Sequence, residues 1–314
     1  MAELATHLRE RDLLRISDWA ADEIAAVLDL AADLKARLKS GEEHRLLTGR
    51  TIGLIFHKPS TRTRVSFAAA LAHLGATPLT LETADMQLSR GETLRDTASV
   101  LSRYLDAIVI RTFSQANVDF LAEHATIPVI NGLTDEAHPC QALADALTIR
   151  ERFGTIEGVR LAYIGDGNNV CASLMTLAAM FGARDVAAIP EGYGPSDRAL
   201  ALARAAAERS GGTIEIVRDP REAAAGADAL YTDVWTSMGQ EDEAERRRRD
   251  FAGYLIDDGL VALSAPNAIV MHDLPAHYGE EITEDVVYGP RSAVWDQAEN
   301  RLHAQKALLA LVVP

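Results

Sequence analysis

Short apolar runs alternate with longer amphipathic stretches along the 314 residues of the chain. The runs are rich in β-branched side chains, as is typical of strands buried in a parallel sheet. They predict strands at residues 51–56, 77–81, 107–111, 127–131, 161–164, 186–189, 214–217, 229–232 and 268–271. Other stretches repeat apolar residues every three or four positions, which predicts helices at residues 16–38, 65–74, 96–105, 139–153, 172–181, 198–210 and 292–313.

The alternation of strands and helices runs through the chain twice, which predicts an α/β protein with two domains. We expect each domain to be doubly wound, with a mostly parallel sheet flanked by helices. The first domain is expected at residues 1–145 and the second at residues 146–291. The helical stretch within residues 292–314 is expected to pack back on the first domain.

Charge and composition narrow the classes of partner. The chain has 31 Lys and Arg against 46 Asp and Glu, a net charge of −15, which argues against nucleic acid or an anionic membrane as a partner. Its two cysteines, Cys140 and Cys171, cannot form a disulfide framework. The first residues show no signal peptide, and no apolar run approaches the roughly 20 residues of a membrane helix. We therefore expect a cytoplasmic protein.

The segment Ser60-Thr61-Arg62-Thr63-Arg64 lies between a predicted strand and a predicted helix. Pro59 disfavours helix before it, and Ser60 is a good N-cap. A helix N-terminus offers unpaired N–H groups and partial positive charge, to which this segment adds hydroxyls and guanidinium groups. The pattern favours a phosphate site over an ordinary capped helix with solvated arginines.

Polar residues also follow other predicted strands, where open α/β sheets place ligands. Arg111 ends one strand, and His138-Pro139-Cys140-Gln141 opens a helix in which His138 and Gln141 can face a carbonyl oxygen or an amide. A zinc site is disfavoured, because His138 and Cys140 lack a second ligand pair at zinc spacing. A capping histidine and a structural turn are the alternatives.

The second half of the chain repeats this arrangement. Gly165-Asp166-Gly167-Asn168-Asn169 follows a strand, but Val170 breaks the glycine fingerprint of a nicotinamide-binding turn, so its amides point to a polar ligand instead. Asp233 follows another strand and suits an ammonium group. The arginines 246–249 are flanked by acids and are expected to form a solvated helix face. Arg301 is a candidate anion ligand or the partner of a nearby acid.

In this order the motifs resemble those of the transcarbamylases, and within that family the ornithine rather than the aspartate carbamoyltransferases. The motifs are Ser60–Arg64, Arg111–Phe113, His138–Gln141, Gly165–Asn169, Asp233–Gln240 and His272–Pro275. The resemblance covers the chain from about residue 8 to its end. It implies a carbamoyl-phosphate domain, an amino-acid domain, and a homotrimer or a multiple of trimers with shared active sites. It also implies carbamoyl transfer from carbamoyl phosphate to L-ornithine, giving L-citrulline and phosphate in arginine metabolism.

The resemblance also implies roles for individual residues and requires neither a metal nor a cofactor. It assigns catalysis to Arg62, Arg111, His138 and Asp273. It assigns carbamoyl phosphate to Ser60, Thr61, Arg62, Thr63, Gln87, Arg111, His138, Gln141, Leu274 and Arg301, with Gln87 reaching an adjacent subunit's site and Leu274 offering its backbone carbonyl. It assigns ornithine to Asn169, Asp233, Ser237 and Met238.

One position departs from the ornithine pattern, which has Cys where this chain has Asp273. An ionised carboxylate about 4 Å from the phosphate dianion would be repelled by roughly 4 kcal/mol per charge pair at an effective dielectric of 20. It could instead attract the substrate's ammonium group or act as its general base. Asp273 therefore leaves two alternatives open: a transcarbamylase for another amine, or a non-catalytic homologue that binds carbamoyl phosphate.

Overall fold

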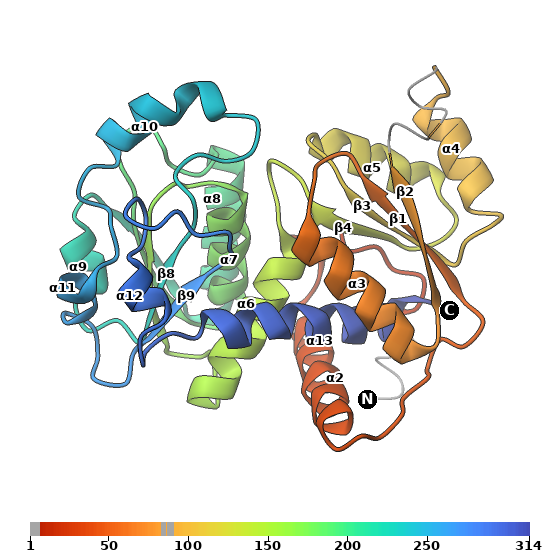
Figure 1. Cartoon of the computed structure of the whole chain (residues 1–314), viewed down its shortest axis with the longest axis horizontal. Helices are drawn as coiled ribbons and strands as arrows, with labels where there is room; N and C mark the ends of the chain where they lie inside the picture. Colours follow the sequence, from red (N-terminus) through yellow and green to blue (C-terminus); the bar gives the residue numbers. More distant parts are fainter. Residues whose placement is uncertain (1–6, 83–85, 87–90) are drawn as a thin grey trace. The chain divides into compact units, whose positions relative to one another are not determined.

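Two parallel sheets, one in each of two structural units, form the framework of the protein (Figure 1). The computed structural model describes residues 7–82, 86 and 91–314. Unit 1 comprises Met1–Leu147 and Asn300–Pro314, and unit 2 comprises Thr148–Glu299. Strand pairing in both sheets is parallel throughout. The predicted α/β class is therefore confirmed.

The sheet of unit 1 has the strand order β2-β1-β3-β4. Its strands are β1 (Thr51–Phe56), β2 (Thr77–Glu82), β3 (Ala107–Arg111) and β4 (Val129–Leu133). Its helical elements are η1 (Ile16–Asp18), α2 (Ala21–Lys39), α3 (Thr61–Leu74), α4 (Leu94–Leu101) and α5 (Gln115–His124). Apolar side chains of α4 and α5 pack on β3 in one buried cluster, which includes Ala98, Val118 and Ile108.

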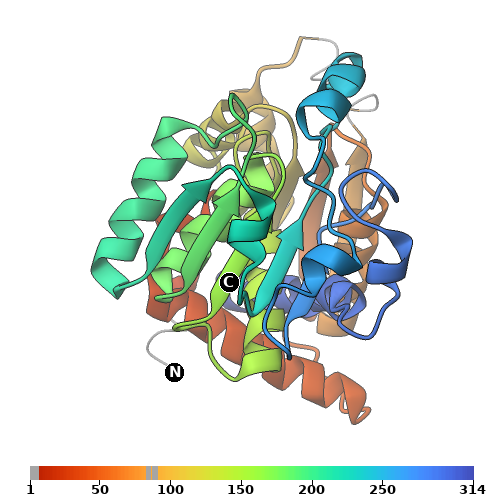
Figure 2. The same ribbon diagram turned by 90° about the vertical axis from the view of Figure 1, so that its left-hand side faces the viewer.

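The sheet of unit 2 has the strand order β7-β6-β5-β8-β9, and Figure 2 shows it from the side of this unit. Its strands are β5 (Arg160–Ile164), β6 (Arg184–Ala188), β7 (Thr213–Val217), β8 (Ala229–Thr232) and β9 (Ile269–His272). Its helical elements are α7 (Asn169–Met180), α8 (Asp197–Ser210), α9 (Pro220–Ala224), η4 (Glu241–Glu243), α10 (Ala244–Asp250), α11 (Asp258–Val261) and α12 (Glu284–Val287).

Helices α6 (Pro139–Phe153) and α13 (Val294–Val312) contribute residues to both units. The boundary between the units falls within α6, after Leu147, and the part of α13 from Asn300 onward belongs to unit 1. Within unit 1, α13 is tied to α2 by two buried lysines. Lys35 Nζ donates to Asn300 Oδ1 at 2.7 Å, and Lys306 Nζ donates to the Leu34 carbonyl at 3.1 Å.

The strand order of each sheet reverses at one point, which is where open α/β sheets bind ligands, beyond the carboxyl ends of the strands. In unit 1 the reversal lies between β1 and β3, and in unit 2 between β5 and β8. Helix α3 follows β1 directly, with Ser60 as its N-cap and Gly75 in the left-handed conformation at its C-terminal end. The motifs after these strands are thus placed at the two reversals.

The structure differs from the sequence prediction mainly at element ends. Strand β4 lies at Val129–Leu133 rather than at 127–131, because Pro128 has no N–H to donate to a ladder. The predicted helix 16–38 is divided into η1 and α2 by extended backbone at Trp19 and Ala20. Helix α5 was not predicted: Val118 and Leu121 are its only buried apolar residues, which is too narrow a stripe to stand out.

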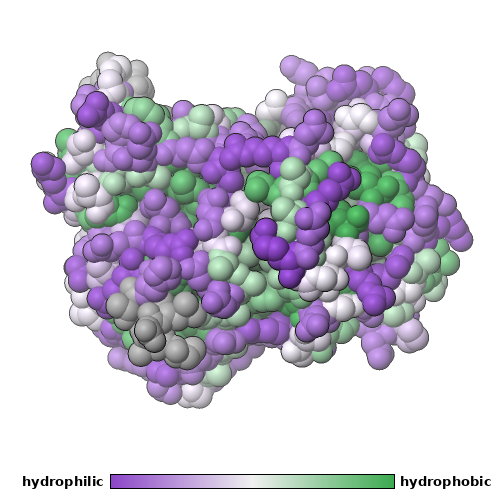
Figure 3. Space-filling model, turned by 180° about the vertical axis from the view of Figure 1, so that it is seen from behind, coloured by the Kyte–Doolittle hydropathy of each residue, from purple (hydrophilic) through white to green (hydrophobic). Residues whose placement is uncertain are grey.

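No helix in the described ranges is both long and apolar enough to cross a membrane. Both cysteines are free and buried. Hydrophilic side chains dominate the face drawn in Figure 3, with smaller apolar patches between them.

Candidate functional site

The N-terminus of α3 in unit 1 is built around a buried hydroxyl. Ser60 Oγ accepts a hydrogen bond from the Thr63 N–H at 3.2 Å, which caps the helix and fixes its first turn. The Thr63 side chain is buried, and its Oγ1 accepts from Arg111 Nη1 at 3.4 Å. Arg111 is the last residue of β3, so the sheet reversal delivers a guanidinium group to the helix N-terminus.

A second guanidinium group, that of Arg301, joins the same place from α13. Its Nη2 donates to Thr63 Oγ1 at 3.0 Å, and its Nη1 donates to Gln141 Oε1 at 2.5 Å. The Gln141 amide donates in turn to Asp145 Oδ1 at 2.8 Å, which fixes the orientation of that side chain. These two contacts join Arg301 to an amide oxygen and a hydroxyl, and its pairing with a nearby acid stays a prediction.

His138 lies beside these arginines, with Nε2 at 3.5 Å from Arg301 Nη1. Burial lowers its pKa well below the ordinary 6.5, and the positive charges of Arg301, Arg111 and Arg62 lower it further. The imidazole is therefore neutral at neutral pH. A neutral ring among guanidinium groups can donate or accept one hydrogen bond at a substrate carbonyl or amide, while the arginines hold an anion.

The remaining residues predicted for this half lie close to the helix terminus or outside the described ranges. Thr61 and Arg62 are exposed in the first turn of α3, where solvent and ligands reach them. Gln87 lies outside the residues that the structure describes. Burial raises the pKa of the neighbouring Cys140 thiol to about 12, so it remains protonated and is a poor metal ligand or nucleophile.

One cation of this region was missed from the sequence. Lys58, two residues after β1, is buried, pairs with Asp135, and places its ammonium group 4.3 Å from the centre of the Phe113 ring. The signal for it was its place directly after a strand, next to the predicted phosphate segment. Because Lys58 pairs with Asp135, the two side chains together add no net charge at the carboxyl end of the sheet.

In unit 2, the turn after β5 approaches the backbone of another loop. A Cβ built on Gly167 would lie 2.4 Å from the Pro195 nitrogen, so only glycine fits there. The next residue, Asn168, caps α7: its Oδ1 accepts from the N–H groups of Val170 at 3.0 Å and Cys171 at 3.1 Å. Gly167 thus allows the close approach of the two loops, and Asn168 sets the start of α7.

The same asparagine holds the acidic residue of the site. Asn168 Nδ2 donates to Asp233 Oδ2 at 2.8 Å, across 65 residues of sequence. Asp233 follows β8 and is 5 % exposed. Burial, and next the negative charge of Asp273, raise its pKa to about 7, although His272 and the bond from Asn168 act in the other direction. Asn169, predicted as the ligand, starts α7 and accepts from Val170 N at 2.9 Å.

The segment after β9 is fixed by a histidine. The Leu274 N–H donates to His272 Nδ1 at 2.8 Å, so the ring proton is on Nε2, which donates to Glu281 Oε1 at 3.0 Å. Leu274 has a φ of 63°, a strained value for a branched side chain. His272, Glu281 and Gln297, whose Oε1 accepts from the His272 N–H at 2.8 Å, therefore hold the backbone at Asp273 and Leu274 in place.

The loop after Asp233 carries the other two predicted ligands. Ser237 N–H donates to Gln240 Oε1 at 3.3 Å, and the Met238 side chain is 44 % exposed. The structure leaves both near the surface of unit 2, within a turn that leads to η4 and α10. Their assignment to a substrate stays a prediction.

The prediction that arginines 246–249 form a solvated helix face is wrong for one of them. Arg247 is buried and donates from Nη1 to Asp166 Oδ2 and to the Trp235 carbonyl, both at 2.8 Å. Its guanidinium group also lies 5.0 Å from the centre of the Tyr193 ring. Arg247 thus joins α10 to the glycine turn after β5, a contact across 81 residues that local charge patterning does not reveal.

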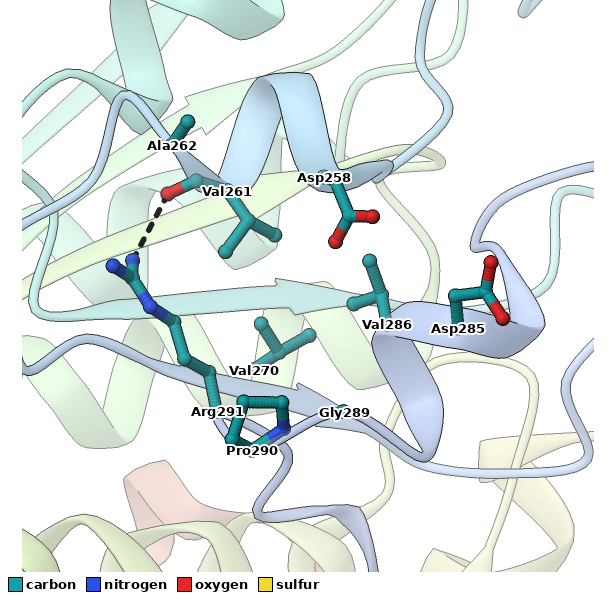
Figure 4. A pocket seen from close by; sticks show the side chains of 9 residues that line it. All are labelled: Asp258, Val261, Ala262, Val270, Asp285, Val286, Gly289, Pro290 and Arg291. Atoms are coloured by element: carbon teal, nitrogen blue, oxygen red, sulfur yellow. Dashed lines mark hydrogen bonds between the residues drawn. The ribbon is translucent and has the colours of Figure 1, made fainter.

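A cavity of about 240 Å³ in unit 2 lies apart from these groups (Figure 4). Val261, Val270 and Val286 line it, with Asp258 and Asp285 at its edge. Arg291 turns its guanidinium group away, donating to the Val261 carbonyl at 3.1 Å, as Figure 4 shows. No residue predicted for the site lines this cavity.

Both halves of the chain match models of one protein family. Residues 11–151 match the aspartate/ornithine carbamoyltransferase, carbamoyl-P binding domain, and residues 157–312 match the Asp/Orn binding domain of the same family. The chain belongs to the aspartate/ornithine carbamoyltransferase family, and is thus a member of a family of carbamoyl-transferring enzymes.

Within this family, the chain is similar over nearly its whole length to proteins named ornithine carbamoyltransferase. An ornithine carbamoyltransferase of Symbiobacterium thermophilum is 56% identical over 98% of this chain and 99% of its own length. An anabolic ornithine carbamoyltransferase of Pyrococcus furiosus is 54% identical, over 99% of this chain and 98% of its own. The solved ornithine carbamoyltransferase of Pyrococcus furiosus superposes with a TM-score of 0.95 at 55% identity, covering 98% of both chains.

Proposed function

We propose that this chain is an ornithine carbamoyltransferase, which transfers the carbamoyl group of carbamoyl phosphate to the side-chain amine of L-ornithine, giving L-citrulline and phosphate. The observation that carries the proposal is the gathering of Arg111, Arg301 and neutral His138 at the N-terminus of α3. The names of relatives 50–56% identical over nearly the whole chain support ornithine as the acceptor.

Carbamoyl phosphate is assigned to unit 1. The phosphate dianion is held by the guanidinium groups of Arg62 and Arg111 and by the N-terminus of α3. His138 and Gln141 contact the carbamoyl oxygen and nitrogen, and Arg301 stands at the same end. The proposed ligands in unit 1 are Ser60, Thr61, Arg62, Thr63, Gln87, Arg111, His138, Gln141 and Arg301, and the role of the Leu274 carbonyl, in unit 2, stays a prediction.

Ornithine is assigned to unit 2. Asp233 binds an ammonium group of the substrate, because a buried carboxylate fixed by Asn168 needs a cation to balance its charge. Asn169, Ser237 and Met238 contact the rest of the amino acid. Asp273, beside Asp233, is the catalytic carboxylate on the side of the acceptor.

The chemistry requires a neutral amine and a stabilised oxyanion. The amine of ornithine has an ordinary pKa of about 10.4, so the site has to remove a proton before attack. The nitrogen then bonds to the carbamoyl carbon, and the carbonyl oxygen gains negative charge that Arg62, Arg111 and His138 stabilise. The bond from carbon to the phosphate oxygen breaks, and phosphate leaves with the second proton of the amine.

We also propose a homotrimer, or a multiple of trimers, in which Gln87 reaches the site of an adjacent subunit. Mass photometry of the purified protein tests it: the 33.9 kDa chain is expected at three times that mass or a multiple of it. A cytoplasmic location and a role in arginine biosynthesis belong to the same proposal. The proposed role in arginine biosynthesis draws on the name of the Pyrococcus furiosus relative, which is called anabolic.

The decisive assay measures citrulline formed from carbamoyl phosphate and ornithine, with putrescine, lysine and acylated ornithine as competing acceptors. We expect ornithine to give the highest kcat/KM. The substitution His138→Asn should lower it by about 100-fold or more, as for loss of a group that stabilises the oxyanion. The control His124→Asn, at the end of α5, should not. Release of phosphate only with another amine, or with none, would refute the assignment.

A further inference from the structure

A buried lysine contacts three loops at the carboxyl end of the sheet in unit 1. Lys58 lies in the turn between β1 and α3, and its side chain is 4% exposed. Its ammonium group forms an ion pair with Asp135, which follows β4. It also lies 4.3 Å from the centre of the Phe113 ring, which follows β3, so a cation–π contact adds to the ion pair.

These contacts reach across the sheet to a strand that is not a neighbour of β1. The strand order places β3 between β1 and β4 (Figure 1). Because neighbouring strands lie about 4.8 Å apart, about 10 Å separates the ends of β1 and β4. The side chains of Lys58 and Asp135 meet across this distance, beside the ring that the middle strand contributes.

Backbone hydrogen bonds join the same segments only in neighbouring pairs. The His57 N–H donates to the Arg111 carbonyl at 2.8 Å, which ties the turn after β1 to the end of β3. The Asp135 N–H donates to the Phe113 carbonyl at 2.8 Å, which ties the segments after β3 and β4. Neither bond joins the turn after β1 to the segment after β4. The ion pair of Lys58 with Asp135 does so directly.

Each of the three segments carries a residue of the anion site. Ser60, the cap of α3, comes two residues after Lys58, and Arg111 is the last residue of β3. His138 comes three residues after Asp135. Because the ion pair is neutral as a whole, its contribution to the site is the placement of these segments rather than added charge.

We propose that Lys58 is a positioning residue for the phosphorylated substrate. It holds the segments after β1, β3 and β4 at the spacing at which the N-terminus of α3, Arg111 and His138 bind one ligand. Lys58 acts through Asp135 and Phe113, without contacting the ligand itself. The nature of that ligand rests on the proposed function.

The first experiment measures the affinity for inorganic phosphate by calorimetry, at constant ionic strength and without an amine. Lys58→Met and Asp135→Ala should each weaken phosphate binding by about fivefold or more, because both remove the same link. Removing the negative charge of Asp135 would by itself favour a nearby anion, so weaker binding in this variant identifies a loss of positioning. Unchanged or tighter binding in Asp135→Ala would overturn the proposal.

A double variant and a matched control sharpen this measurement. Lys58→Met/Asp135→Ala should bind phosphate about as weakly as either single variant, and multiplied effects would overturn the shared link. The control Arg50→Met breaks an ion pair with Asp106 at the opposite ends of β1 and β3, and should leave the affinity unchanged. Because Asp135 is 58% exposed, Asp135→Ala should fold and keeps the proposal testable if Lys58→Met does not.

Steady-state kinetics supply a readout that a general loosening of the fold would not give. The KM for carbamoyl phosphate should rise by about fivefold or more in Lys58→Met, whereas the KM for ornithine, assigned to unit 2, should change by less than about twofold. Lys58→Arg should restore most of the loss, because a guanidinium group also pairs with a carboxylate and lies over an aromatic ring. Equal rises in both KM values, or equal losses in Lys58→Arg and Lys58→Met, would overturn the role of Lys58.

The outcomes separate this proposal from the proposed function. Weaker phosphate binding in both single variants, with no citrulline formed from any amine, would refute the proposed function and leave the role of Lys58 standing. Citrulline formation with unchanged phosphate binding in Asp135→Ala would do the reverse. A wild type that does not bind phosphate would refute the anion site and the role of Lys58 with it.

Discussion

Breaking the ion pair between Arg247 and Asp166 should destabilise unit 2 more at pH 7.5 than at pH 5. The two side chains are 7% and 9% exposed, and their nearest atoms are 2.8 Å apart. Burial raises the pKa of Asp166 to about 6 from an ordinary 3.8, even though Arg247 opposes the shift. The substitution Arg247→Met keeps an unbranched, though shorter, apolar side chain and removes the charge.

The sign of the effect follows from the raised pKa. When a carboxyl group has a higher pKa in the folded chain than in the unfolded chain, the folded protein loses stability as pH rises. The loss begins near the pKa of the unfolded state and ends near the pKa of the folded state. In the wild type this loss ends near pH 6, where Asp166 is ionised in both states. Without Arg247 the carboxyl stays protonated to higher pH, and the loss continues at about 1.4 kcal/mol per pH unit.

Between pH 6 and 7.5 the variant therefore loses about 2 kcal/mol beyond the wild type. Loss of the hydrogen bond from Arg247 to the Trp235 carbonyl costs about another 1–2 kcal/mol at any pH, because the oxygen is left buried without that donor. We expect a total destabilisation of about 1–2 kcal/mol at pH 5 and about 3–4 kcal/mol at pH 7.5. The larger figure lies in the range measured when one partner of a buried ion pair is removed.

Urea unfolding followed by circular dichroism at the two pH values measures both figures. Arg249→Met removes an exposed arginine from the same helix and should change stability little. The double variant Asp166→Asn/Arg247→Met lacks the titrating group. It should therefore not show the extra loss of stability above pH 6 that we expect of Arg247→Met. An equal loss at pH 5 and 7.5 in Arg247→Met would refute the electrostatic reasoning.

Three further substitutions test other parts of the structure. Arg301→Gln should lower kcat/KM for carbamoyl phosphate by about 100-fold or more, because Thr63, Gln141 and His138 lose a shared cation. The control Arg103→Gln, at an exposed arginine, should not lower it. Equal activity in both variants would contradict the assignment. Gly167→Ala should destabilise by about 1–3 kcal/mol in thermal unfolding, because its Cβ would meet backbone of Gly194 and Pro195, whereas Gly194→Ala, with open space around its Cβ, serves as the neutral control. Burial lowers the pKa of Lys306 to about 8 from 10.5, so between these pH values the folded chain binds fewer protons than the unfolded chain. The stability of the wild type should therefore rise with pH over this range relative to that of Lys306→Met. Chemical denaturation at several pH values measures this, and parallel curves for the two proteins would contradict the prediction.

The strands were predictable because a buried parallel strand is a continuous apolar run with polar residues at its ends. Strands β1, β3 and β8 begin and end at the predicted residues. Helix starts were less predictable, because the first turn is set by the cap. Helix α3 begins at Thr61 rather than at 65, since Ser60 caps a turn whose residues are polar and lie outside the apolar stripe.

The grouping of the candidate site was predictable only in part. Residues that follow the strands at a sheet reversal, such as Arg111 and Asp233, could be located from topology alone. The side-chain contacts between distant segments could not. Asn168 reads in sequence as one of two equivalent amides, and only the fold shows that it caps a helix and holds Asp233. Arg247 reads as one of four solvated arginines for the same reason.

The opposite charges of the two units bear on the repulsion expected of Asp273. Unit 1 gathers guanidinium groups at the N-terminus of α3, and unit 2 gathers carboxylates after β8 and β9. An ionised carboxylate repels a phosphate dianion, by roughly 4 kcal/mol for each pair of unit charges at about 4 Å and an effective dielectric of 20. An ammonium group bound at these carboxylates cancels one unit of their negative charge. Because that cancellation needs a cationic acceptor, we expect ornithine to raise the affinity for phosphate or carbamoyl phosphate, and Asp273→Asn to weaken this coupling. Calorimetric titration of phosphate with and without ornithine measures the coupling directly, and an identical coupling in Asp273→Asn would contradict the argument.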